Sequence, residues 1–166
     1  MQFHLNGFQT GNPEENNGKN SIRNPPRMRN LTEKADVLIV GCGPAGLTLA
    51  AQLSKFSDIK TVIVEQKEDK LLLGQADGVA CRTMEMFEAF GFSDKVLKEG
   101  YWVNETVFWK PDDKNPKNII RSSKIQDTEE GLSEFPHMVL NQARVHDFSL
   151  DLMKNSPTGL EPDYSR

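Results

Sequence analysis

The stretch ADVLIVGCGPAGLTLAAQL, residues 35–53, contains a near-continuous apolar run, a glycine-rich turn and the start of a helical pattern. Residues 35–41 lack the alternation of a half-exposed strand, which favours a strand covered on both faces in a parallel sheet. From Pro44 to Phe56 the apolar residues recur at helical spacing, and Pro44 falls in the first turn, where proline is tolerated. A second strand is predicted at residues 60–66 (KTVIVEQ), so the segment forms a strand–helix–strand unit with a right-handed crossover.

The turn of this unit matches the GxGxxG pattern of dinucleotide-binding sites. It consists of Gly41, Cys42, Gly43, Pro44, Ala45 and Gly46. Such a hexamer is weak by itself, but here it follows a strand, opens a helix and precedes Glu65 by 19 positions. We expect Gly41 to make the tight turn, Gly43 to let the backbone approach a diphosphate, and Gly46 to let the helix lie close to the strand. A diphosphate would then rest on the N–H groups at the start of the helix.

Glu65 ends the second strand, where a carboxylate can accept hydrogen bonds from ribose hydroxyl groups. A solvated charge at a strand end is the alternative interpretation. An acid at this position also disfavours the extra phosphate of NADP, so the turn indicates FAD or NAD, and its pattern does not choose between them.

Further elements are predicted along the rest of the chain. They are helices at residues 81–90 and 93–99, a strand at 101–109 with an antiparallel partner at 118–125, a short strand at 137–141, and a helix at 142–154. Asn141 is placed to cap the last helix. The fold class is therefore α/β, with a Rossmann-like strand–helix–strand unit and an added β-hairpin.

Composition sets limits on the possible functions. Residues 1–33 are rich in Asn, Gly, Pro and charge, which predicts a flexible N-terminal arm before a domain at residues 34–166. The net charge of -4 and the absence of a basic cluster argue against nucleic-acid binding. No apolar run is long enough to span a membrane, and the two cysteines match no zinc or disulfide spacing. We expect a cytoplasmic protein without a metal site.

Three segments together resemble a known family. They are DVLIVGCGPAGLTLAAQL (36–53), GQADGVACRTMEMFEAFGF (74–92) and HMVLNQARVHD (137–147). They resemble the flavin-dependent aromatic hydroxylases of the phenol 2-monooxygenase and 3-hydroxybenzoate 4-monooxygenase group, and the resemblance runs from MQFHLNGF to LEPDYSR. It implies a glutathione-reductase-like FAD-binding fold. It also implies FAD as cofactor, NAD(P)H as electron donor, a phenolic substrate, dioxygen, and homodimers in complete members.

The resemblance assigns roles to individual residues. FAD contacts would fall on the turn (Gly41, Gly43, Pro44, Ala45, Gly46), on Glu65 and Gln66, on Gln75 and Ala76, and on Gln142. Asp77 matches the carboxylate that deprotonates the phenolic hydroxyl group, so that hydroxylation occurs ortho to it, and His137 matches a position near the substrate carboxylate. An ordinary role in a turn before Gly78 is the alternative for Asp77, and an ordinary strand-end histidine is the alternative for His137.

Members of this family are several times longer than this chain. We therefore expect residues 34–166 to be a partial FAD-binding domain, without its later strands and substrate domain, and to be inactive alone. A non-catalytic nucleotide-binding or interaction module is a second hypothesis, since the strand–helix–strand unit alone would suffice for it. An NAD-dependent dehydrogenase is a third, which the GQADG segment (74–78) disfavours.

Overall fold

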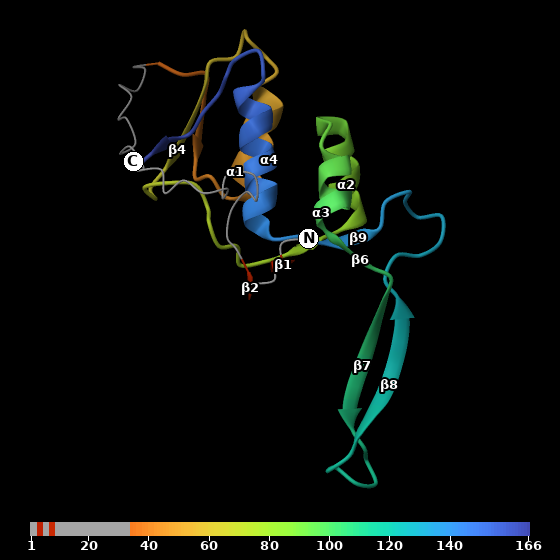
Figure 1. Cartoon of the computed structure of the whole chain (residues 1–166). Helices are drawn as coiled ribbons and strands as arrows, with labels where there is room; N and C mark the ends of the chain where they lie inside the picture. The colour runs from red at the N-terminus through yellow and green to blue at the C-terminus, as the bar shows by residue number, and fades with distance from the viewer. Residues whose placement is uncertain (1–2, 5–6, 9–33) are drawn as a thin grey trace. The chain divides into compact units, whose positions relative to one another are not determined.

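The computed structural model describes residues 3–4, 7–8 and 34–166, and the chain divides into two compact units (Figure 1). One unit is discontinuous and combines residues before 77 with residues 141–166. The other, the inserted unit, holds residues 77–140. Strands β1 (Phe3–His4) and β2 (Gly7–Phe8) pair antiparallel. The flexible arm expected at residues 1–33 otherwise lies outside the described residues and stays a prediction.

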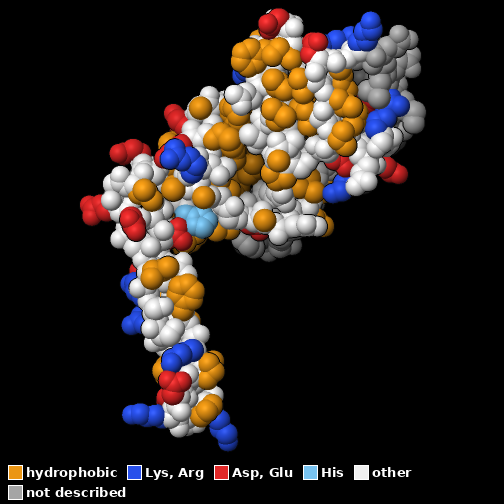
Figure 2. Space-filling view, turned by 180° about the vertical axis from the view of Figure 1, so that it is seen from behind, with side chains coloured by type: hydrophobic (Ala, Val, Ile, Leu, Met, Phe, Trp, Pro, Cys, Tyr) orange, Lys and Arg blue, Asp and Glu red, His pale blue; other side chains and the backbone are white. Residues whose placement is uncertain are grey.

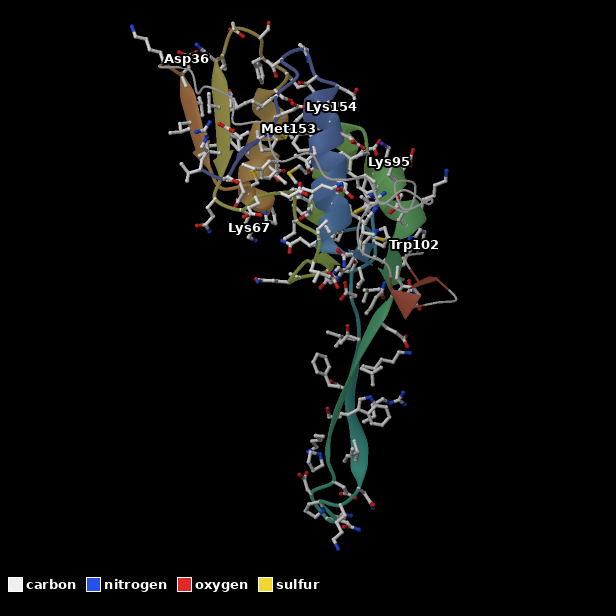
Figure 3. The ribbon with its side chains drawn as sticks, turned by 60° about the vertical axis from the view of Figure 1, so that its left-hand side comes forward. Asp36, Lys67, Lys95, Trp102, Met153 and Lys154 are labelled. Atoms are coloured by element: carbon white, nitrogen blue, oxygen red, sulfur yellow. The ribbon has the colours of Figure 1, made fainter. Side chains whose placement is uncertain are left out.

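The discontinuous unit is built on a parallel sheet with the strand order β10-β4-β3. Its elements are β3 (Val37–Val40), α1 (Pro44–Leu53), β4 (Thr61–Glu65), α4 (Gln142–Lys154) and β10 (Asp163–Tyr164). The predicted strand–helix–strand unit is therefore confirmed. Helices α1 and α4 pack against each other and lie side by side in both ribbon views (Figures 1 and 3). Asn141 caps α4 as predicted, since its Oδ1 accepts the Ala143 N–H at 2.8 Å.

The core of this unit lies between its helices and one face of the sheet. Ile39 and Ile63 from the strands, Leu47 and Ala50 from α1, and Met153 from α4 are buried. Burying a side chain as large as Ile or Leu stabilises the fold by about 1.5–3 kcal/mol. These contacts fix α1 and α4 relative to the carboxyl ends of β3 and β4.

Strand β3 is not covered on both faces, so that sequence prediction was wrong for the described chain. Ile39 is 6% exposed, whereas Leu38 is 61% and Val40 is 79% exposed. Helix α1 packs on the Ile39 face, and no described residue buries the other face. An apolar run indicates that both faces of a strand lack polar residues, but it does not indicate which segment covers each face.

The inserted unit contains a second sheet with the antiparallel order β5-β9-β6. Its elements are β5 (Gly78–Val79), α2 (Cys81–Phe90), α3 (Ser93–Glu99), β6 (Tyr101–Val103), β7 (Glu105–Pro111), β8 (Ile119–Gln126) and β9 (His137–Val139). The predicted helices at 81–90 and 93–99 are confirmed. The single strand predicted at 101–109 is instead divided at Asn104 into β6 and β7, because β6 pairs with β9 and β7 pairs with β8.

Strands β7 and β8 form the added hairpin, and they pair with each other alone among the described strands (Figure 1). Hydrophobic and charged side chains are interspersed along it (Figure 2). Phe108 and Trp109 are 48% and 63% exposed, and the register shifts between them. The hairpin therefore has no apolar core of its own, and its cross-strand hydrogen bonds and side-chain pairs hold it together.

The contact between α1 and β3 predicts the response to substitutions in the turn. A Cβ added at Gly46 would lie 2.0 Å from the Gly41 carbonyl oxygen, so Gly46→Ala must push the helix away from the strand. We expect a loss of about 1–3 kcal/mol in the free energy of unfolding, measured by urea denaturation. Alanine is otherwise favoured over glycine inside helices by about 0.5–1 kcal/mol, so a destabilisation is diagnostic.

Gly43→Ala is the matched control for this measurement. An added Cβ at Gly43 meets nothing within 4 Å, and the residue has an ordinary φ of -69°. Its stability should change by less than about 1 kcal/mol. Equal losses in the two variants would contradict the packing role of Gly46.

Candidate functional site

The glycine-rich turn joins the end of β3 to the start of α1. Gly41 has a φ of +100°, which side-chain-bearing residues rarely adopt, and its N–H donates to the Val64 carbonyl at 2.7 Å. Gly43 is the residue before α1, and no side chain caps the helix there. The first turn of α1 also has no acidic residue. Its N–H groups and the positive end of its dipole are therefore available to an anion.

Glu65 connects the end of β4 to this turn. Its Oε2 accepts the Cys42 N–H at 2.7 Å, and its Oε1 accepts the Lys67 N–H at 3.0 Å. The hydrogen bond from Cys42, followed by that from Lys67, lowers the pKa of the Glu65 carboxyl group, while burial opposes this. The side chain is thus an ionised acceptor beside the turn at neutral pH.

Gln142 connects the first turn of α4 to the segment before Asp77. Its Oε1 accepts the Gln75 N–H at 2.9 Å. Gly74 lies so close that a Cβ there would approach the Gln142 Cβ to 2.4 Å. The contact holds residues 74 and 75 against the start of α4.

A cavity of about 250 Å³ lies among these groups in the discontinuous unit. Of the residues expected to contact a cofactor, it is lined by Gly43, Pro44, Glu65, Gln75 and Gln142. The others, Gly41, Ala45, Gly46, Gln66 and Ala76, do not line it. Gly41 and Gly46 shape the turn behind it, whereas Ala45, Gln66 and Ala76 have exposed side chains outside its wall.

The sequence interpretation gave no cofactor contact to the other seven residues of this wall, which are Cys42, Lys67, Asp69, Leu71, Leu73, His146 and Tyr164. Burial, and then the charge of Glu65, raises the pKa of the Cys42 thiol to about 12, so this thiol stays protonated. Burial lowers the pKa of His146, with Asp147 acting in the opposite direction. His146 follows Gln142 by one helical turn, and that spacing could have indicated a shared face. Nothing in the sequence around Tyr164 indicates its role in the wall.

Asp77 and His137 belong to the inserted unit. The Asp77 carbonyl accepts the Leu140 N–H at 2.8 Å, which continues the pairing of β5 with β9, and its side chain is exposed. His137 opens β9, and its Nδ1 lies 2.7 Å from Asp127 Oδ2. Its Nε2 lies 3.4 Å from where a Cβ on Gly78 would be. Asp77 therefore lies directly before β5, whose pairing partner β9 begins at His137, and Asp127 is a partner that the sequence did not indicate.

The described residues offer neither a metal-binding cluster nor a membrane-spanning helix. In the described part of the chain, no three His, Cys, Asp or Glu side chains are grouped so that they could hold a metal ion. Among the helices of the same residues, none is both long and apolar enough to cross a membrane.

Comparisons with known proteins agree with this geometry. A family model described as "FAD binding domain" matches residues 34–159. The chain is 61% identical over all of its 166 residues to a 3-hydroxybenzoate 4-monooxygenase of Comamonas testosteroni, and it spans 26% of that protein. It is 32% identical to a phenol 2-monooxygenase of Aspergillus fumigatus, over 72% of this chain and 20% of that protein.

Solved structures show the same fold. The flavin-dependent monooxygenase PieE, in complex with FAD and substrate, aligns with a TM-score of 0.63 at 22% identity, over 79% of this chain and 24% of that one. The p-nitrophenol 4-monooxygenase PnpA from Pseudomonas putida aligns with a TM-score of 0.65 at 20% identity, over 79% of this chain and 32% of that one. At these identities the likeness supports the fold alone.

The lowered pKa of Glu65 predicts how stability depends on pH. A carboxyl group whose folded pKa is depressed stabilises the fold above its unfolded pKa, and this contribution is lost as pH falls through the folded value. Glu65→Gln keeps an acceptor oxygen but cannot titrate. Wild type should therefore be more stable than Glu65→Gln at pH 7, and the difference should shrink below about pH 4.3, the ordinary Glu pKa. Urea unfolding at a series of pH values measures it, and a pH-independent difference would contradict it.

Proposed function

Because the chain belongs to the FAD-binding-domain family of flavin-dependent aromatic monooxygenases, we propose that residues 34–166 bind FAD and serve ring hydroxylation of a phenolic substrate. The observation that carries the proposal is the cavity at the uncapped start of α1, beside the ionised Glu65. This chain spans about a quarter of the length of its Comamonas relative. We therefore propose the hydroxylation activity for a protein as long as this relative, and FAD binding for the chain itself.

The fit of FAD to the site rests on complementary charge and open backbone. A diphosphate would lie on the N–H groups at the start of α1. It could approach them closely because Gly43 has no side chain and the space beside it is empty of protein atoms. A sugar hydroxyl group would donate to Glu65, which is already an acceptor for the Cys42 N–H. The cavity, at about 250 Å³, is somewhat below the roughly 300–1,000 Å³ of ligand pockets, so it suits the middle of a dinucleotide better than a whole one.

Bound FAD would supply the redox chemistry, with electrons from NADH or NADPH and with dioxygen as the source of the inserted oxygen. The residues of this chain would hold the cofactor and position the substrate. Asp77 would act as the general base on the phenolic hydroxyl group, since its side chain is exposed in the segment directly before β5. Removing that proton raises the electron density on the ring carbon ortho to the oxygen, which is the carbon to be hydroxylated.

His137 would contact a carboxylate on the substrate ring. Its Nδ1 is held by Asp127, so Nε2 is the nitrogen left to face a ligand. An imidazole N–H at Nε2 would donate a hydrogen bond to the substrate carboxylate. A ring carrying both a hydroxyl and a carboxyl group, as in 3-hydroxybenzoate, would use both Asp77 and His137.

Cofactor binding is tested by a side chain placed on the diphosphate path. Gly43→Val should abolish binding of FAD to the full chain while leaving the fold intact, because the space it fills is empty of protein atoms. Flavin fluorescence titration measures binding, and circular dichroism checks the fold. Ser123→Val, on the exposed β8 strand, is the control and should bind FAD as wild type does. Unchanged binding by Gly43→Val would remove the turn from the site, and a wild-type chain that binds nucleotides but no flavin would favour the non-catalytic alternative.

The catalytic role of Asp77 is tested in a chimera in which this chain replaces the matching quarter of the Comamonas relative. Asp77→Asn should retain FAD but lower kcat at neutral pH by about 10²–10⁴-fold, because an amide cannot accept the proton. The loss should shrink as pH approaches about 10, where a phenol ionises unaided. Asp113→Asn, in the hairpin turn, is the matched control. Wild-type turnover by Asp77→Asn at neutral pH would leave Asp77 as a turn residue.

A further inference from the structure

Two buried polar atoms in the cavity wall have no hydrogen-bond partner among the described residues. They are His146 Nδ1 on α4 and the Tyr164 hydroxyl group on β10. His146 is 5% exposed, and both residues line the cavity that contains Glu65 and Gly43. Tyr164 pairs in register with Glu65 across the parallel strands β10 and β4. The two atoms thus belong to the site proposed for the cofactor, although the sequence pattern assigned neither residue a role.

Buried polar atoms without partners are uncommon, because each has given up its hydrogen bonds to water. The charged residues next to His146 on α4 have partners of their own. Asp147 accepts from Lys70 Nζ at 3.0 Å and from Arg144 Nη1 at 2.9 Å, and Arg144 also lies over the Phe148 ring. Loose packing of α4 therefore does not explain the unpartnered atom of His146, and both atoms belong to residues that line the cavity, where a ligand could satisfy them.

The hydrogen-bonding capacity of the wall indicates what kind of ligand it takes. Burial lowers the pKa of His146 and keeps the ring neutral, whereas the nearby Asp147 and a hydrogen bond from the ring to the Cys42 backbone act in the opposite direction. In a neutral ring that donates through one nitrogen, the other nitrogen, Nδ1, is an acceptor. Burial raises the pKa of Tyr164, so its hydroxyl group stays protonated and can donate or accept.

Glu65 adds a carboxylate acceptor to the same wall. The diphosphate of a dinucleotide has no proton to donate at neutral pH, so it would satisfy neither His146 Nδ1 nor Glu65. A sugar hydroxyl group both donates and accepts, and a chain of such groups could satisfy His146, Tyr164 and Glu65 together.

We propose that His146 and Tyr164 bind sugar hydroxyl groups of FAD and thereby hold a sugar part of the cofactor in this cavity. The inference rests on the proposed function, and it adds two residues that the dinucleotide motif does not contain. The hydroxyl groups can come from the ribose of the adenosine half or from the ribityl chain of the flavin half. Both sources offer hydroxyl groups that can donate and accept, and titrations with ADP and with FMN distinguish them.

The test compares Tyr164→Phe with wild type in the full chain. Tyr164→Phe removes only the hydroxyl group, so the Kd for FAD should rise about threefold to tenfold, the effect of losing one hydrogen bond. The ligand-free protein should be no less stable to urea, because the deleted group had no protein partner. Tyr101→Phe, at a residue that is 75% exposed, is the matched control and should leave both quantities unchanged.

His146→Leu is the second variant, and it should also raise the Kd for FAD. Calorimetric titrations with ADP and with FMN then measure whether the variants lose affinity for the adenosine ribose or for the ribityl chain. Weaker binding of ADP alone would place the contact on the ribose, and weaker binding of FMN alone would place it on the ribityl chain; either result supports the inference.

Unchanged FAD affinity in both variants would overturn the inference. So would a Tyr164→Phe protein that is less stable without ligand and binds FAD normally, because the hydroxyl group would then hold a structural water. In either case loss of FAD binding by Gly43→Val would leave the proposed function standing. A wild-type chain that binds no FAD would overturn both.

Discussion

The close approach of α1 to β3 at Gly46 positions nearly every group of the site. Because Gly46 has no Cβ, the helix lies against the Gly41 carbonyl, and its uncapped first turn faces the end of the strand. Helix α4 packs on α1, which brings Gln142 and His146 to the same cavity as Glu65. A methyl group at this one position would act on the turn, on both helices and on the cavity between them.

The proposed site has groups suited to an anion next to groups suited to hydroxyl groups. The helix start offers N–H donors, whereas Glu65 and His146 Nδ1 offer acceptors a short distance along the wall. A dinucleotide has the matching sequence of groups, because its diphosphate lies between two polyhydroxyl segments. The residues proposed to act on the substrate, Asp77 and His137, belong to the inserted unit, into which the chain passes after residue 76 and from which it returns at residue 141.

Elements with a strong local pattern could be predicted from the sequence, and those that depend on a distant partner could not. Helices 81–90, 93–99 and 142–154 carry their own apolar periodicity, and their bounds agree with the structure. Strands β5 and β10 contain two residues each, too few for any alternation, and they exist because β9 and β4 offer them hydrogen bonds. The division at Asn104 has the same cause, since the strands on its two sides have different partners.

The sequence by itself determined the α/β class, the glycine-rich turn and the acid at the end of the second strand. These depend on short-range spacing and on residue types that few other turns require. The resemblance added Gln75 and Gln142, which the structure brings into hydrogen-bonding contact. Only the tertiary structure decided that Cys42, His146 and Tyr164 share a wall with Glu65, and that Asp127 holds His137. Those residues meet through the packing of segments far apart in the chain, and no local pattern records which side chains such packing will bury together.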